Sequence, residues 1–354
     1  MLLQNRTPFL AFTFESLDLA GEPFHVIVIK GTFDIVVGAG LRPAAQQEPV
    51  KTSDEHWGDA TSSSLRWEDD LAPFKPHADI LVNATAHAPG GYPAREWAAG
   101  ITVGDLTKRV LVTGPRAWVH APLLGWSLGD PVLTAAVPIR YEHAFGGKVE
   151  QDGASQVYEK NPVGVGFVDL RRLNTSRPVP APTVLPLDGH IPALGKPCPV
   201  EGLSAIAKAW QPRRARAGTF DAAWIAERHP RLPSDFDPTY YNCAHPDLIY
   251  DGHLRGDEVV RLERLHPEHE FLTFRLPALT VAAAITDRDA HRYGGPARLD
   301  TLCVDAERMK ALLTWRLTLP LYTRGIAKLD VGARESLAMT LERAAGTVAT
   351  QEGG

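Results

Sequence analysis

The sequence predicts a mainly β protein with an antiparallel, sandwich-like core, a long Pro- and Gly-rich central segment and few short helices. Glycine and proline are frequent, at 30 and 29 of the 354 residues, which favours many turns and short elements over long helices. Short apolar runs alternate with Pro, Gly and Asp over the first 150 residues, and no helix-length apolar periodicity separates them. Repeated strand–helix–strand units are therefore not expected. The length suggests about two domains.

The region 1–150 is predicted to be β-rich. Residues 9–14 and 24–29 are apolar runs joined by a connection that contains Gly and Pro, which is typical of a β-hairpin. Further strands, separated by Pro, Gly and Asp, are expected at residues 80–86, 97–103, 109–113, 117–120 and 132–141.

The region 151–254 is interrupted by prolines throughout, so we expect an ordered segment that wraps the core. Its aromatic residues, such as Tyr158 and Phe236, are typical anchors of a loop on a packed surface, and a free linker would lack them. Short helices are expected at residues 203–210 and 220–228.

The region 255–330 is predicted to return to strands and to complete the core. Residues 258–265 and 271–276 flank a connection that contains Pro, which again indicates a hairpin. Residues 313–319 alternate apolar and polar side chains, which predicts one buried face of a strand, with Arg316 on the opposite face. The buried face consists of Leu313, Trp315, Leu317 and Leu319.

No segment carries the signature of a targeting or membrane-spanning element. The first residues lack a basic start followed by an apolar block. The longest apolar run, residues 279–285, is far shorter than the roughly 18–20 residues that cross a bilayer. The last region, 331–354, is expected to form a short helix at 335–345 and to fray at its end. We therefore expect a cytoplasmic protein without a membrane partner.

The charge and the cysteine content limit the possible partners and cofactors. The formal net charge is −5, so charge alone does not predict nucleic-acid binding. Cys198, Cys243 and Cys303 are odd in number and far apart, which predicts neither a disulfide framework nor a cysteine zinc site. No glycine-rich phosphate-binding motif is complete, and no cofactor is expected.

Two patterns could indicate an enzyme, and neither completes a catalytic constellation. Residues 125–129 read G-x-S-x-G, but Asp, Pro and a predicted strand follow where a nucleophile elbow needs a helix, so we expect a turn there. His266 and His269 fall in a predicted hairpin turn. A second stretch of possible metal ligands comprises His245, Asp247, Asp251 and His253. We expect no enzyme, and a metal-dependent hydrolase that uses residues 245–269 stays open as an alternative.

The charge is distributed unevenly along the chain. Residues 171–231 carry ten Lys and Arg residues against four Asp and Glu residues, so this segment is basic and the remainder is acidic. Arginine and tryptophan are enriched in binding hot spots. The segment either docks on the acidic remainder of its own chain or binds an acidic protein partner; nucleic acid is a third alternative. The predicted partner-binding residues are Trp210, Arg213, Arg214, Arg216 and Trp224.

A set of short strings in a fixed order makes the chain resemble a known bacterial family. The strings are K-G-T-F at 30–33, D-L-A-P-F-K-P at 70–76, A-H-A-P at 86–89, E-H-A-F-G-G at 142–147, N-P-V-G-V-G-F at 161–167, P-R at 212–213, A-G-T-F-D at 217–221, D-F-D at 235–237, G-D-E at 256–258 and W-R at 315–316. Together, over residues 4–320, they are similar to a former domain-of-unknown-function family associated with bacterial type VI secretion. The chain departs from that pattern at 184–188 and 246–248, which affects loop contacts.

The resemblance implies a non-enzymatic adaptor chaperone. Members of that family help to load a toxic effector onto the spike trimer or its PAAR-type tip. An effector toxin and a spike or tip protein are therefore the expected partners, and the family implies no catalytic residues. A structural component of a phage-tail-like spike stays open as a further alternative.

Overall fold

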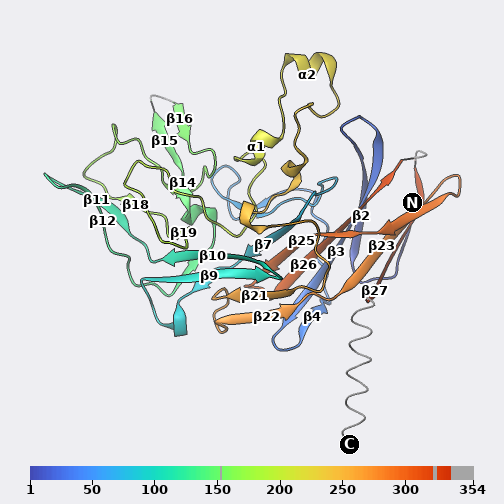
Figure 1. Ribbon diagram of the computed structural model, residues 1–354, viewed down its shortest axis with the longest axis horizontal. Helices are drawn as coiled ribbons and strands as arrows, with labels where there is room; N and C mark the ends of the chain where they lie inside the picture. Colours follow the sequence, from blue (N-terminus) through green and yellow to red (C-terminus); the bar gives the residue numbers. More distant parts are fainter. Residues whose placement is uncertain (152–153, 322–324, 336–354) are drawn as a thin grey trace, which may run out of the picture.

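The computed structural model describes residues 1–151, 154–321 and 325–335, and these residues form β-strands far more often than helices (Figure 1). Their strands are arranged in three larger sheets, of seven, five and four strands, together with several smaller ones. No helix in the described ranges is long and apolar enough to cross a membrane. The prediction of a mainly β fold is confirmed, although some sheets are mixed rather than antiparallel.

The seven-stranded sheet combines early, central and late segments of the chain. Its strand order is β2 (Leu10–Leu17), β3 (Pro23–Val36), β26 (Lys310–Pro320), β25 (Arg298–Asp305), β7 (Ala78–Asn83) and β20 (Ile249–Tyr250), and β4 (Gly40–Pro43) pairs with β3. β25 and β7 run parallel, whereas the other pairs are antiparallel. The predicted hairpin of residues 9–14 and 24–29 is confirmed as β2 and β3.

Two further sheets also combine early with late segments. The five-stranded sheet is antiparallel, in the order β19 (Val184–Pro186), β10 (Leu106–Thr113), β9 (Glu96–Val103), β21 (Val259–Glu263) and β22 (Phe271–Arg275). The four-stranded sheet has the order β1 (Leu2–Asn5), β27 (Ile326–Glu335), β23 (Leu279–Asp287) and β24 (Arg292–Pro296), with β1 parallel to β27. One cluster of buried apolar side chains contains residues of all three sheets, among them Ile29, Val110 and Ile285.

Short strands and helices complete the described chain. The paired strands are β5 (Glu55–His56) with β6 (Leu65–Trp67), β8 (Thr85–His87) with β13 (Ala136–Pro138), β14 (Phe145–Gly146) with β17 (Val165–Gly166), and β15 (Lys148–Gln151) with β16 (Ala154–Val157). β11 (Ala117–Ala121) lies between β12 (Gly125–Leu128) and β18 (Val179–Pro180). The helices are α1 (Arg213–Arg216), α2 (Ala222–Glu227) and 3₁₀ helices at Pro89–Gly91, Tyr141–His143, Pro238–Tyr241 and Pro246–Leu248.

The expected helix at 203–210 is wrong, because neighbouring strands and loops take up its backbone hydrogen bonds. The backbone oxygen of Leu203 accepts a hydrogen bond from the Val82 N–H at 2.8 Å. The Ile206 N–H donates to the Cys243 backbone oxygen, also at 2.8 Å. An α-helix needs these groups for its own ladder, so tertiary pairing overrides the local preference for helix.

The other expected helix, at 220–228, is confirmed as α2. The carboxylate of Asp221 accepts a hydrogen bond from the Trp224 N–H at 2.9 Å, which caps the first turn. The expected strand at 132–141 is largely wrong, because only β13 forms there and a 3₁₀ turn follows. The expected helix at 335–345 and the frayed end lie outside the described residues, apart from the last residue of β27.

Strand β26 carries the predicted alternation but is covered on both faces. Trp315 is only 2% exposed and stacks on Phe9, with ring centroids 5.5 Å apart, so its predicted burial is confirmed. Leu317, on the same face, is half-buried. Arg316 points to the opposite face and is buried as well, which the alternation does not predict.

We expect Trp315→Ala to lower the free energy of unfolding by about 3–5 kcal/mol, because it leaves a large cavity in the core. Urea unfolding of the full chain measures this loss. Phe12→Ala is the matched control, since Phe12 is 39% exposed on the edge strand β2, and it should cost about 1 kcal/mol or less. Equal losses for the two variants would contradict the burial of Trp315 in the core.

Candidate functional site

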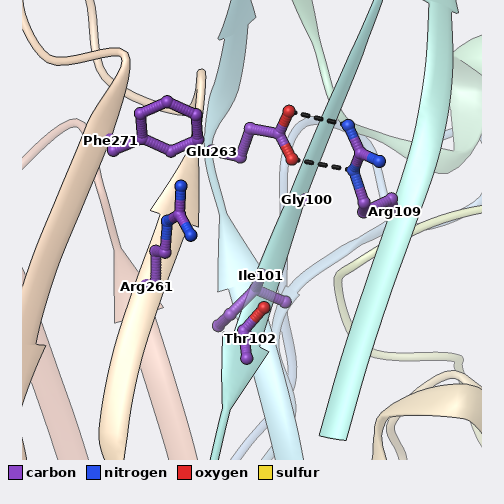
Figure 2. Close-up of a pocket in the computed structure, with 7 residues that line it drawn as sticks. All are labelled: Gly100, Ile101, Thr102, Arg109, Arg261, Glu263 and Phe271. Atoms are coloured by element: carbon purple, nitrogen blue, oxygen red, sulfur yellow. Dashed lines mark hydrogen bonds and ion pairs between the residues drawn. The ribbon is translucent and has the colours of Figure 1, made fainter.

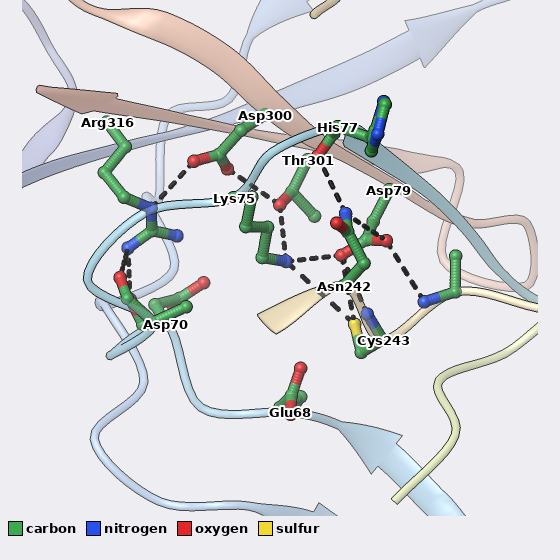
Figure 3. Close-up of polar contacts among 12 residues, drawn as sticks. Glu68, Asp70, Lys75, His77, Asp79, Asn242, Cys243, Asp300, Thr301 and Arg316 are labelled. Atoms are coloured by element: carbon green, nitrogen blue, oxygen red, sulfur yellow. Dashed lines mark hydrogen bonds and ion pairs between the residues drawn. The ribbon is translucent and has the colours of Figure 1, made fainter. Parts of the chain in front are cut away.

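The loop between β6 and β7 is tied to the seven-stranded sheet by buried ion pairs (Figure 3). Lys30 Nζ lies 2.6 Å from Asp70 Oδ2. Arg316 donates from Nε to Asp300 Oδ2 at 2.7 Å and from Nη1 to the backbone oxygen of Asp70 at 2.8 Å. The side chains of Lys30, Arg316 and Asp300 are at most 4% exposed. Each charge is compensated, and removing one partner would leave the other buried and unpaired.

Asp79, on β7, is joined to these ion pairs through Lys75, whose Nζ donates to Thr301 Oγ1 at 3.0 Å, and through that hydroxyl, which donates to Asp300 Oδ1 at 2.9 Å. The Asp79 side chain is fully buried, and one carboxylate oxygen lies 2.7 Å from Lys75 Nζ. The carboxylate also accepts hydrogen bonds from the backbone N–H groups of Cys243 and Ala244, at 3.0 and 3.1 Å, and from Asn242 Nδ2 at 3.1 Å. The Asp79 carboxylate therefore joins residues 242–244 of the central segment to the seven-stranded sheet through hydrogen bonds.

The protonation states of these groups suit a structural role. Burial alone would lower the pKa of Lys75, but the interactions with Asp79, Cys243, Asp300 and Glu68 together outweigh it and raise that pKa above its usual value. Burial alone would raise the pKa of Asp79, but Lys75 and the hydrogen-bond donors hold it below its usual value. Burial raises the pKa of the Cys243 thiol well above its ordinary range. The pair stays charged and the thiol stays protonated near neutral pH, so none of them is an activated base or nucleophile.

A pocket of about 490 Å³ opens beside this network. Lys75, His253, Asp300 and Arg316 are among the residues that line it. Arg316 pairs with Asp300, Lys75 pairs with Asp79, and a ring nitrogen of His253 lies 3.0 Å from the Lys75 backbone oxygen. Three of the charged side chains of this pocket, Lys75, Asp300 and Arg316, are thus engaged in internal ion pairs.

The possible metal ligands at 245–253 are not gathered around one point. His245 and Asp247 meet Glu201, but Lys108 Nζ lies 2.6 Å from the Glu201 carboxylate and 2.9 Å from that of Asp247. His245 Nδ1 accepts the Asp247 N–H, and Nε2 lies 3.2 Å from the Val200 backbone oxygen. The buried ammonium of Lys108 supplies the positive charge that a metal ion would bring.

The remaining candidates stand apart from that group. His253 contacts the Lys75 backbone oxygen, whereas Asp251 is exposed and lies 3.6 Å from His77. The rings of His266 and His269 stack 4.9 Å apart in the β21–β22 connection. Among the described residues, neither histidine belongs to a group of three metal-capable side chains.

The G-x-S-x-G string does not form a nucleophile elbow. Its serine, Ser127, is exposed on β12 and lies opposite Val119 of β11 in an antiparallel hairpin. The turn of this hairpin precedes the string, with Leu123 at a φ of 69°, so the expected turn at 125–129 is a strand instead. No helix follows to present the hydroxyl, as an elbow requires.

Two of the predicted partner-binding residues, Trp210 and Arg213, lie inside the protein. Arg213 Nη2 is 2.7 Å from Glu68 Oε1, and Nη1 donates to the backbone oxygen of Ile206 at 2.6 Å. Trp210 packs edge-on against Tyr141, with ring centroids 5.6 Å apart. Both side chains attach the central segment to its own core, and neither is open to a partner.

The other three predicted residues, Arg214, Arg216 and Trp224, lie at or near the surface. Arg214 is exposed, and Arg216 and Trp224 are half-buried. Two neighbours of Trp224 are strongly exposed apolar side chains, Phe220 at 55% and Ile225 at 65%. Figure 1 shows α2 at the end of a segment that projects from the sheets. Partner binding by this region stays a prediction.

The strings at 142–147 and 161–167 pack against each other. Asn161 Nδ2 donates to the backbone oxygens of Tyr141 and Phe145, at 2.8 and 3.0 Å. Gly146 has a φ of 153°, and a Cβ at this position would lie 2.1 Å from the Asn161 backbone oxygen. Close backbone approach explains this glycine without any ligand.

Sequence reasoning missed Asp79 and Lys108, although each carries a signal. Asp79 is a charged residue within the fully buried strand β7, and Lys108 shares one face of β10 with the buried Val110 and Val112. A buried charge must be paired, so such a residue indicates an internal partner elsewhere in the chain. The sequence does not reveal which partner, because the carboxylates that neutralise Lys108 come from distant loops.

Comparison with known proteins identifies one family. The family described as an uncharacterized protein conserved in bacteria (DUF2169) matches residues 20–316. No curated protein and no solved structure matches the chain.

We expect Arg316→Met to lower the free energy of unfolding by about 3–5 kcal/mol, because Asp300 then stays buried without its partner. The double variant Arg316→Met/Asp300→Leu should lose less than the sum of the two single variants, since it removes both charges. Urea unfolding of all four proteins measures this coupling. Additive losses would show that the pair is not the source of the cost.

We expect the protein to lose stability as the pH falls below neutral. Burial, together with the charge of Lys108, lowers the pKa of His245 in the folded state. Below the ordinary histidine pKa of about 6.5, His245 is protonated in the unfolded chain but still neutral in the folded one. The free energy of unfolding is therefore highest above that pKa and decreases as the pH falls below it.

Urea unfolding at about pH 7.5 and about pH 5.5 measures this change. His245→Gln should reduce the difference between the two pH values, because that variant has no imidazole to protonate. The same difference in the variant and the parent would contradict the assignment to His245.

Proposed function

The chain belongs to the bacterial DUF2169 family, and we propose that it is a non-enzymatic adaptor chaperone of type VI secretion. In this proposal it binds a toxic effector in the cytoplasm and helps to load it onto the spike or its PAAR-type tip. The ordered set of strings described above supports this reading. The match covers most of the chain, so the proposal concerns the whole fold.

The observation that carries a binding role is the projecting segment around α2. Phe220 and Ile225 are 55% and 65% exposed, although apolar side chains of this size are usually buried. Trp224 lies between them in the sequence and contacts Phe220 edge-on, with ring centroids 4.8 Å apart. An aromatic and aliphatic cluster on a projection is typical of a protein–protein contact.

The helix that precedes this cluster in the chain, α1, carries exposed or half-buried basic side chains. Arg214 is 54% exposed and pairs with the equally exposed Glu159, and Arg216 is half-buried. Exposed guanidinium groups at the edge of a protein–protein contact pair with carboxylates of the partner and steer its approach. An acidic surface on the effector or on the spike would fit this side of the molecule.

Co-purification of the tagged full chain from a bacterium that encodes it tests the proposal. We expect the toxin and the spike or tip protein to be recovered and identified by mass spectrometry. Recovery of neither would contradict the adaptor function. A stable place of the chain in the assembled, secreted particle would instead favour a structural spike component.

We expect Phe220→Ser/Ile225→Ser to weaken the recovery of the partner by about tenfold or more, since exposed anchors of this kind dominate binding. The melting temperature should stay near that of the parent because both side chains are exposed. Leu123→Ser/Leu124→Ser, on the exposed tip of the β11–β12 hairpin, is the matched control and should keep full recovery. Equal recovery by all three proteins would exclude α2 as the contact.

A further inference from the structure

The outer face of the five-stranded sheet carries a shallow pocket of about 350 Å³ (Figure 2). Its polar side chains come from three adjacent strands: Arg109 from β10, Thr102 from β9, and Arg261 and Glu263 from β21. Phe271, from the edge strand β22 of this sheet, is 45% exposed beside them. These residues lie away from the projecting α2 segment and take no part in the buried charge network.

A rigid ion pair frames one side of this pocket. Arg109, Gly100 and Glu263 lie directly opposite one another on three neighbouring strands. Arg109 crosses over Gly100 and donates from Nε and Nη2 to the two carboxylate oxygens of Glu263, each at 2.8 Å. Gly100 permits the crossing, because a Cβ there would lie 2.9 Å from Arg109 Cγ. The Glu263 carboxylate also accepts a hydrogen bond from Arg264, so two arginines neutralise its charge.

Arg261 is held on the same face without an anion. Its guanidinium carbon lies 4.0 Å from the centroid of the Phe271 ring, which fixes the planar group against the strand. Within the described ranges, neither Arg261 nor its neighbour Arg275 on β22 forms an ion pair, and both side chains are exposed. On a chain with a net charge of −5, this face therefore has an excess of positive charge.

We propose that this face binds an acidic segment of a partner protein, with a carboxylate on Arg261 and an apolar side chain against Phe271. A guanidinium fixed by an aromatic ring pairs with a carboxylate in a bidentate fork at little entropic cost. Nucleic acid is the less favoured ligand, since a strand of phosphates needs a longer basic track than these arginines supply. The proposal deepens the adaptor function and rests on it for the presence of a partner protein.

A binding assay with the full chain tests the chemistry. The probe is a short fluorescein-labelled peptide that alternates Glu and Val, and its binding is followed by fluorescence anisotropy. The same peptide with Gln in place of Glu and a single-stranded oligothymidylate of equal length are the comparisons. We expect the Glu peptide to bind best, and to bind more weakly as salt is added.

Arg261→Gln should weaken binding of the Glu peptide roughly tenfold. Arg334→Gln is the matched control, because Arg334 is also an exposed strand arginine, on β27 of another sheet, and it should bind as the parent does. Unchanged binding by Arg261→Gln, equal binding of the Gln peptide, or tighter binding of the oligothymidylate would each overturn the proposal.

Co-purification separates this proposal from the adaptor function. If the parent recovers the toxin or the spike and Arg261→Gln recovers as much, the site is wrong and the adaptor function stands. If the parent recovers neither protein, the adaptor function fails whatever the peptide does. If the parent recovers the partner and Arg261→Gln does not, at an unchanged melting temperature, the result supports both the proposed site and the adaptor function.

Discussion

The carboxylate of Asp79 is the contact on which the arrangement of the chain depends. It lies on β7, in the seven-stranded sheet, and it holds the ammonium of Lys75 and the backbone of Cys243 and Ala244 at once. A buried charge is costly unless its partners surround it, so the sheet, the 68–77 loop and the central segment must come together as a unit. The central segment is thereby ordered despite its many prolines.

The network also explains why the strings that identify the family need no catalytic role. Five charged residues of those strings form internal ion pairs: Lys30, Asp70, Lys75, Arg213 and Arg316. Gly146 and Asn161 serve a close backbone contact. Because these groups are satisfied inside the protein, we propose that a partner contacts the periphery, at the projecting α2 segment and at the arginine-bearing face of the five-stranded sheet.

The local patterns of the sequence predict local structure well and long-range pairing poorly. Two hairpins, the capped helix α2 and the burial of Trp315 follow from apolar runs, turn residues and period-two alternation. The burial of Arg316 does not follow, because its partner Asp300 and the loop that covers it are set by tertiary contacts. Arg213 illustrates the same limit. It lies in a basic segment, which predicts an exposed side chain, but it is buried in an ion pair with Glu68, a carboxylate distant in the sequence.

Hydrogen exchange of the Asp79→Asn variant, compared with the parent, tests the central role of this carboxylate most directly. The substitution keeps the size of the side chain and removes its charge. We expect the amides of Cys243 and Ala244, which donate to the carboxylate at 3.0 and 3.1 Å, to exchange much faster in the variant, together with residues 203–206. The amides of β3 and β26 should stay protected. Parental exchange rates at Cys243 and Ala244 would contradict the central role of the Asp79 carboxylate.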